Sequence, residues 1–175
     1  MESVLQSAVR RFVSHEHIRN VLEGEWSEMY DDHGQPLPGI RGRMGVAATT
    51  EEGVEFGIDL IEMEPGAGFP LHIHPGDHIL YVLQGPGIVH VDGVDHHVRD
   101  GDSIFVPAEY VHGVQTLPDA PHALRFLAVG HPHKHIESTD RMTLVEPDEH
   151  GHSHGHGHSH GHGHSHGHSH SHPHS

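Results

Sequence analysis

The 175-residue sequence has no cysteine, a single lysine (Lys134) and no hydrophobic residue from His150 to Ser175. Without cysteine there is neither a disulfide framework nor a thiolate metal site, so nitrogen and oxygen atoms must bind any metal. Basic residues number nine against 25 acidic ones, and the net charge of −16 argues against nucleic-acid binding. No stretch approaches the ~18 apolar residues of a membrane span, and MESVLQSAVRRF lacks the apolar core of a signal peptide. We therefore expect a soluble, cytoplasmic protein that does not bind membranes.

The N-terminal quarter has the pattern of a helix followed by an arm. Residues 2–23 carry apolar side chains at helical spacing, and Gly24 is a plausible stop. The next segment, YDDHGQPLPG at residues 30–39, is rich in turn formers and predicts a linker or an extended arm. We expect a short N-terminal helix and this arm to occupy residues 1–44.

From about Ile40 the pattern changes to short alternating segments bounded by glycine, proline and aspartate. Asp92-Gly93, between two such segments, predicts a tight hairpin. The segments predicted as strands are 40–49, 54–63, 78–85, 87–93, 94–98, 103–107, 111–117 and 123–130. This many short strands predicts an all-β sandwich or barrel, which we place at residues 45–130. Residues 131–149 are expected to lead away from it as an exit segment.

Three histidines occur within the apolar stretch GAGFPLHIHPGDHILYVLQG at residues 66–85. His72 and His74 are two residues apart, so on a strand they project to the same side. A Pro-Gly turn follows, and His78 begins the next strand. All three side chains can therefore converge on one point.

A fourth histidine, His112, ends a second glycine-to-proline segment, GDSIFVPAEYVHG at residues 101–113. Four imidazoles inside an apolar barrel would destabilise the fold, because burying a polar group without a partner costs several kcal/mol of free energy. A bound metal ion removes that cost. The remaining histidines of the barrel, and HPHKH at residues 131–135, are expected to be solvated or structural.

The two segments resemble the two sequence motifs of the cupin family, over about residues 45–130. In the first, Gly66 is followed by His72, His74, a ligand position and Gly85; in the second, Gly101 is followed by Pro107, Glu109 and His112. The resemblance implies a double-stranded β-helix, or jelly-roll barrel, with one metal ion between its sheets. The implied ligands are His72, His74, His78 and His112. His78 stands where glutamate is most frequent, as in four-histidine cupins, whereas Glu109 and Thr116 replace the usual glycine and asparagine.

Neutral imidazoles leave the full charge on the ion, which then favours an anionic oxygen ligand such as an enolate, phenolate or carboxylate. The ligand type does not decide between iron, manganese, nickel and zinc. The function that we prefer is a dioxygenase-type oxidoreductase, which uses a redox-active ion to oxygenate a small enolisable or aromatic molecule. With zinc, we expect a cyclase or isomerase that resembles cupin polyketide cyclases. The third alternative is a non-enzymatic metal-binding or storage protein.

No general acid or base is assigned from the sequence. Tyr110 is a candidate for proton transfer, because it lies two residues before His112 and so can face the same side of a strand. Tyr81, Glu109 and Arg125 are further candidates, although each is as readily a turn or surface residue.

The C-terminal tail, residues 150–175, has histidine at every even position from 150 to 174. It has no apolar residue to offset chain entropy, so we expect disorder. The tail resembles the His-rich extensions of proteins that handle nickel and zinc, and we expect it to bind those ions and supply the barrel. A purification tag or a solubilising segment are the alternatives. Because cupins often dimerise, the resemblance also implies a homodimer, with the N-terminal helix and arm on the partner.

Overall fold

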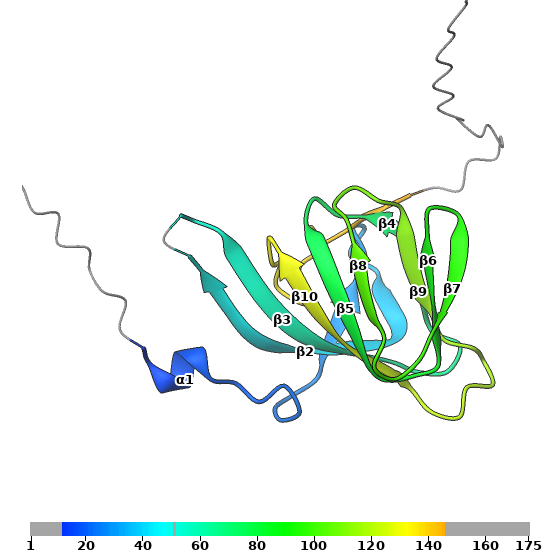
Figure 1. Ribbon diagram of the computed structural model, residues 1–175, viewed down its shortest axis with the longest axis horizontal. Coiled ribbons are helices and arrows are strands. Elements are labelled where there is room, and N and C mark those ends of the chain that lie inside the picture. The colour runs from blue at the N-terminus through cyan, green and yellow to red at the C-terminus, as the bar shows by residue number, and fades with distance from the viewer. Residues whose placement is uncertain (1–11, 51, 146–175) are drawn as a thin grey trace, which may run out of the picture.

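The computed structural model describes residues 12–50 and 52–145, which form two antiparallel β-sheets packed face to face (Figure 1). The six-stranded sheet has the order β1-β2-β3-β10-β5-β8, and the five-stranded sheet has the order β11-β4-β9-β6-β7. The all-β barrel expected from the alternating pattern is confirmed. The strands are β1 Ser27–Tyr30, β2 Pro36–Thr49, β3 Glu55–Met63, β4 Gly68–Ile73, β5 Asp77–Gln84, β6 Gly87–Val91, β7 Val94–Val98, β8 Ser103–Val106, β9 His112–Gln115, β10 Leu124–His131 and β11 Thr143–Leu144.

Alternation along the strands fills the space between the sheets with apolar side chains. In β5, Leu80 and Val82 are buried while Ile79 and Tyr81 are exposed. The hairpin between β6 and β7 forms as predicted: Asp92 and Gly93 have φ of 50° and 76°, the left-handed conformation that a type I′ turn requires at both central residues. The core between the sheets consists mainly of Ile61, Met63, Phe69, Leu80, Val82, Val89, Val106, Val114, Leu124 and Phe126.

The N-terminal helix is shorter than the pattern of residues 2–23 predicts. Within the described residues, α1 spans only Ser14–His17, and residues 1–11 lie outside them. Phe12, Ile18 and Leu22 remain 63–66% exposed, so these three side chains pack little against the described part of the chain. A helix this short is marginal without such packing.

No helix among the described residues is long and apolar enough to cross a membrane.

Residues 30–39 form a hairpin rather than a linker. Strand β1 pairs with β2, with Ser27 opposite Gly42, so the sheet extends upstream of residue 45. The side chain of Asp31 makes the turn by accepting hydrogen bonds from the backbone N–H groups of His33 and Gln35, at 2.9 and 2.7 Å. The short polar run that reads as a linker is therefore the turn between two paired strands.

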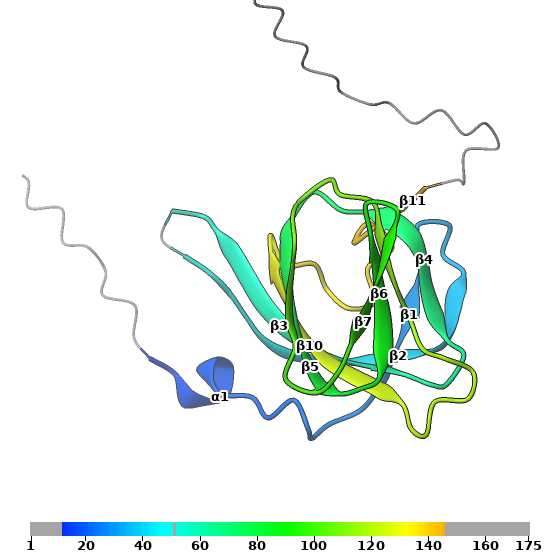
Figure 2. The same ribbon diagram turned by 45° about the vertical axis from the view of Figure 1, so that its right-hand side comes forward.

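The described part of the exit segment returns to the barrel instead of leading away from it. Residues 132–142, here called the returning segment, run from the end of β10 into the space between the sheets, as the yellow and orange trace of Figure 2 shows. Strand β11 then pairs with β4, with Leu144 opposite His72. Ile136 and Met142 anchor the returning segment in the core, at 1% and 4% exposure.

Candidate metal centre

Three of the predicted ligands meet at one end of the five-stranded sheet. His72 lies in β4 directly opposite His112, the first residue of β9, and His74 follows β4 on the same side as His72. All three are buried, and one potential ligand atom from each lies within 4.8 Å of the others. The Nε2 atoms of His74 and His112 are 3.1 Å apart. We call these three residues the histidine cluster.

Each ring of the histidine cluster is held by a backbone carbonyl two residues away in the chain. Nδ1 of His72 donates to the carbonyl of Pro70 at 2.7 Å, and Nδ1 of His112 donates to that of Tyr110 at 2.9 Å. Nδ1 of His74 donates to the carbonyl of Gly76 at 2.6 Å. A carbonyl only accepts, so the proton of each neutral ring is on Nδ1 and the lone pair is on Nε2. Ligand histidines are typically oriented in this way.

Burial keeps these imidazoles neutral. Burial, helped by the neighbouring His112, lowers the pKa of His72 to about 3. Burial lowers the pKa of His112 to about 4 and also lowers the pKa of His74, although a backbone hydrogen bond partly opposes it at each ring. Near pH 7 the rings are therefore in the form that binds metal, and few protons have to be displaced.

The donor set fits a divalent transition-metal ion. With both Nδ1 atoms protonated, the Nε2 lone pairs of His74 and His112 face each other at 3.1 Å, which is repulsive unless a cation lies between them. Imidazole nitrogen is a preferred ligand of iron, nickel, copper and zinc. A bound ion would supply a Lewis acid at this end of the barrel.

His78, the fourth predicted ligand, lies beside the histidine cluster and not within it. Its ring centroid is 3.8 Å from that of His74, but among the described residues the convergent group comprises only the three cluster histidines. Burial, followed by the charges of His74 and Arg141, lowers the pKa of His78 to about 2. His78 is thus another neutral imidazole within reach of the cluster.

A cavity of about 50 Å³ opens directly onto these four histidines. We call it the histidine cavity. It holds one charged side chain, Arg141, from the returning segment. Its remaining walls are apolar: Ile61, Phe69, Leu80, Val114, Phe126, Ala128 and Met142.

The candidates for proton transfer named from the sequence do not line this cavity. The side chain of Tyr110 is exposed, and the contribution of this residue is its carbonyl, which orients His112. Tyr81 is exposed on the outer face of the six-stranded sheet. Arg125 is paired with Glu62.

Sequence reasoning missed a second polar group, which lines a side pocket next to the cluster. Asp59 of β3 is almost fully buried, and its Oδ2 lies 3.2 Å from Nε2 of His133 and 3.9 Å from Nη2 of Arg141. The His133 ring occupies the space that a side chain on Gly57 would fill. The only signal in the sequence was an acid within the apolar run GIDLIEM. Nothing in the pattern indicated Arg141.

Residues 59–130 match the family model described as Cupin_2, a cupin domain. Dimethylsulfoniopropionate lyase DddW of Ruegeria pomeroyi is 30% identical over 87 residues, which cover 50% of this chain and 55% of that protein. An oxalate-binding protein of Thermotoga maritima is 33% identical over 70 residues, which cover 39% of this chain and 56% of that protein. The chain thus spans about half the length of the curated relatives that it matches.

Solved structures show the same fold. A cupin-2 domain protein of Rhodospirillum rubrum, Rru_A2000, superimposes with a TM-score of 0.56 at 18% identity, over 70% of this chain and 75% of that one. The polyketide cyclase RemF of Streptomyces resistomycificus does so with a TM-score of 0.52 at 24% identity, over 64% of this chain and 75% of that one. The motif spacing, the paired sheets and the family match agree: residues 59–130 are similar to a cupin domain, and the fold is that of the cupin-2 structures.

Proposed function

We propose that the protein is a cupin and a metal-dependent enzyme that acts on a small organic molecule bound through an oxygen atom in the histidine cavity. The observation that carries the proposal is the convergence of three Nε2 lone pairs beside a mainly apolar cavity. Neutral ligands leave the charge of the ion available to polarise a carbonyl or to stabilise an oxyanion. Apolar walls around a few polar groups are typical of small-molecule sites.

We also propose that His78 is the fourth ligand. Its neutral ring lies against His74 and lines the same cavity. Gly130 leaves the space that the ring needs, because a Cβ at that position would lie 3.0 Å from Nε2 of His78. A rotation of the side chain is a small change compared with a backbone movement.

For the reaction class we favour redox-neutral Lewis-acid chemistry. It is supported by the similarity to a protein named as a lyase, with 30% identity over 87 residues. Oxygenation, the class preferred from the sequence, is the second candidate and requires a redox-active ion such as iron, manganese or nickel. The similarity to an oxalate-binding protein supports the third alternative, binding of a small molecule without turnover.

Reconstitution separates these classes. The full chain is stripped of metal, loaded in turn with zinc, iron, manganese and nickel, and incubated with small carboxylates, dimethylsulfoniopropionate among them. Turnover of the zinc form without oxygen is expected and supports the redox-neutral class. Turnover that consumes oxygen and occurs only with redox-active ions assigns an oxygenase, and binding without turnover under every condition contradicts an enzyme. His112→Ala abolishes turnover, whereas His97→Ala, at an exposed position, is the matched control.

A further inference from the structure

The returning segment brings one cation, Arg141, into the histidine cavity. Its side chain is 11% exposed and also lines the side pocket that contains Asp59. Its position is fixed by the elements around it, because Met142 is buried in the core and Leu144 of β11 pairs with His72 of β4. An arginine that only solubilised a surface would not be held at this depth.

The guanidinium group of Arg141 has more hydrogen-bonding capacity than its neighbours use. Among residues 12–50 and 52–145 it makes one hydrogen bond, from Nη1 to the carbonyl of Ile136 at 3.1 Å. Its Nη2 lies 3.9 Å from Oδ2 of Asp59, too far for a hydrogen bond. A guanidinium has five N–H donors, so most of them are available to the cavities that the side chain lines.

Asp59 does not fully compensate this buried cation. Its carboxylate is shared with His133, at 3.2 Å, and its Oδ1 atom is buried without a partner among the described residues. Burial lowers the pKa of Arg141, and the charge of Asp59 offsets this only in part. The guanidinium nevertheless remains charged, since arginine is not deprotonated in proteins. The histidine cavity therefore has a positive side that lacks a close anionic partner.

We infer that Arg141 recognises the anionic group of the substrate, and that the substrate is a small carboxylate. This inference rests on the proposed function only in taking the histidine cavity as the substrate site. The planar fork of arginine matches a carboxylate with two parallel hydrogen bonds. A cavity of about 50 Å³ encloses on the order of four water-sized atoms. A carboxylate with a short apolar chain, packed against Phe69 and Phe126, has the matching size and polarity.

Binding of propionate and of its neutral isostere propionamide tests the inference without any need for turnover. Both are titrated calorimetrically into the full chain, first stripped of metal and then loaded with zinc. Arg141→Gln is expected to weaken the binding of propionate at least tenfold in both the metal-free and the zinc-loaded form, and to leave the affinity for propionamide unchanged. Arg99→Gln, which makes the same charge change at an exposed position, is the control and is expected to change neither. Equal affinity of the wild type and Arg141→Gln for propionate overturns the inference, as does a wild type that does not bind propionate.

Asp59→Asn separates recognition from a merely structural role and is the deciding variant should Arg141→Gln fail to fold. If Arg141 binds the anion, removal of the competing carboxylate leaves propionate affinity unchanged or increases it. If Arg141 only tethers the returning segment to Asp59, the affinity for propionate falls in Asp59→Asn as it does in Arg141→Gln, and the inference is wrong. Propionate binding without turnover under any metal would contradict the proposed function and leave the role of Arg141 standing.

Discussion

His78 differs from the histidine cluster in how its ring is held. Each cluster histidine has Nδ1 fixed by a backbone carbonyl, whereas the ring of His78 makes no hydrogen bond to any group within residues 12–50 and 52–145. Ligands whose orientation is fixed beforehand bind more tightly, and loss of such support typically costs about 10–100-fold in metal affinity. The rings of the histidine cluster are thus oriented in advance for metal binding, whereas the ring of His78 is not.

We therefore predict that His78→Ala weakens zinc binding to the core site by about tenfold, and that His112→Ala weakens it by about 100-fold or more. The measurement is competition of the full chain with a chelator, in which only the most tightly bound equivalent of zinc is analysed, since we expect any sites on the tail to be weaker and to exchange faster. His97→Ala, exposed in β7, should leave this equivalent unchanged. Equal losses for His78→Ala and His112→Ala would instead make all four histidines equivalent ligands.

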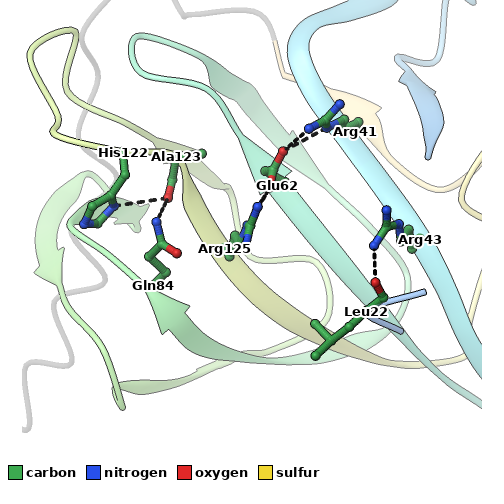
Figure 3. A network of polar contacts seen from close by, with 8 residues as sticks. All are labelled: Leu22, Arg41, Arg43, Glu62, Gln84, His122, Ala123 and Arg125. Atoms are coloured by element: carbon green, nitrogen blue, oxygen red, sulfur yellow. Dashed lines mark hydrogen bonds and ion pairs between the residues drawn. The ribbon is translucent and has the colours of Figure 1, made fainter. Parts of the chain in front are cut away.

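Glu62 of β3 is a buried carboxylate on the outer face of the six-stranded sheet, the face away from the histidine cavity. It lies between Arg41 and Arg125 (Figure 3). Burial acts to raise its pKa, but hydrogen bonds from both arginines and their charges outweigh burial and hold the pKa below its ordinary value. Its side chain is 5% exposed, and Arg41 also lies over the ring of Trp26, with its Cζ 4.5 Å from the ring centroid. This contact joins the segment before β1 to the sheet.

Glu62→Gln should therefore destabilise the protein by about 1–3 kcal/mol at pH 7. Because the pKa is lower in the folded state, the carboxylate stabilises the fold above its unfolded-state pKa, near 4.5, and this contribution is lost as the pH falls through the folded-state value. The difference in unfolding free energy from the wild type should thus shrink between pH 7 and pH 3. Glu55→Gln, exposed on the same strand, is the control. A difference that is independent of pH would mean that the charge of Glu62 is not the stabilising feature.

At the scale of elements, the returning segment depends on Ile136. This side chain is 1% exposed and packs against the bare backbone of Gly42, where an added Cβ would lie 2.0 Å from its Cδ1 atom. We predict that Ile136→Ala lowers the unfolding free energy by about 2–5 kcal/mol, the usual cost of such a cavity. It should also weaken propionate binding, because the Ile136 side chain anchors the backbone carbonyl that accepts a hydrogen bond from Arg141. Denaturant unfolding and calorimetry measure the two effects, with Val94→Ala, 53% exposed, as the control. Unchanged propionate affinity would show that Arg141 is positioned without Ile136.

The strands that the sequence predicted are those with a clear alternation of apolar and polar residues. Strands β5 to β8 and β10 lie within one or two residues of their predicted segments, and the Asp92-Gly93 hairpin is confirmed. His72, His74 and His112 were predictable because each lies in a motif of fixed spacing, and local strand geometry then brings them together. Alternation and short-range spacing are local properties, and a single sequence displays them.

The parts that were missed depend on long-range contacts. Strand β11 has two residues, too few for any period, and it exists because the returning segment docks at Ile136. Strand β1 adjoins a turn-rich segment that reads as a linker. Arg141 enters the cavity from 29 positions beyond His112 in the chain, so no motif connects the two. A contact between distant segments cannot be predicted from the spacing of the residues within either segment.

At the scale of the whole molecule, the outer face of the six-stranded sheet carries an apolar patch. Ile79, Tyr81 and Leu83 project from β5, and Phe105 of β8 lies opposite Ile79; all four are 40–61% exposed. We predict that two copies of the chain associate through this outer patch. The net charge of −16 opposes that contact, so association should strengthen with ionic strength. Light scattering with size-exclusion chromatography measures it: Ile79→Asp should give a monomer, and Val94→Asp, on β7 of the other sheet, should not. A wild type that is monomeric at every salt concentration contradicts the prediction.

The His-rich tail lies outside the described residues, and its role remains a prediction from the sequence. We expect its thirteen histidines at alternate positions to offer several weak sites for nickel or zinc, tethered to the tighter site proposed in the barrel. Such a tether raises the effective ion concentration near the barrel when metal is scarce and has no effect when metal is abundant. We therefore predict that replacing every tail histidine by serine lowers chelator-resistant occupancy of the core site at limiting zinc and leaves it unchanged at saturation. A variant in which His96 and His97 are replaced is the control, since both are exposed outside the tail. Identical loading of the tail variant and the wild type at every zinc concentration would show that the tail does not supply the barrel.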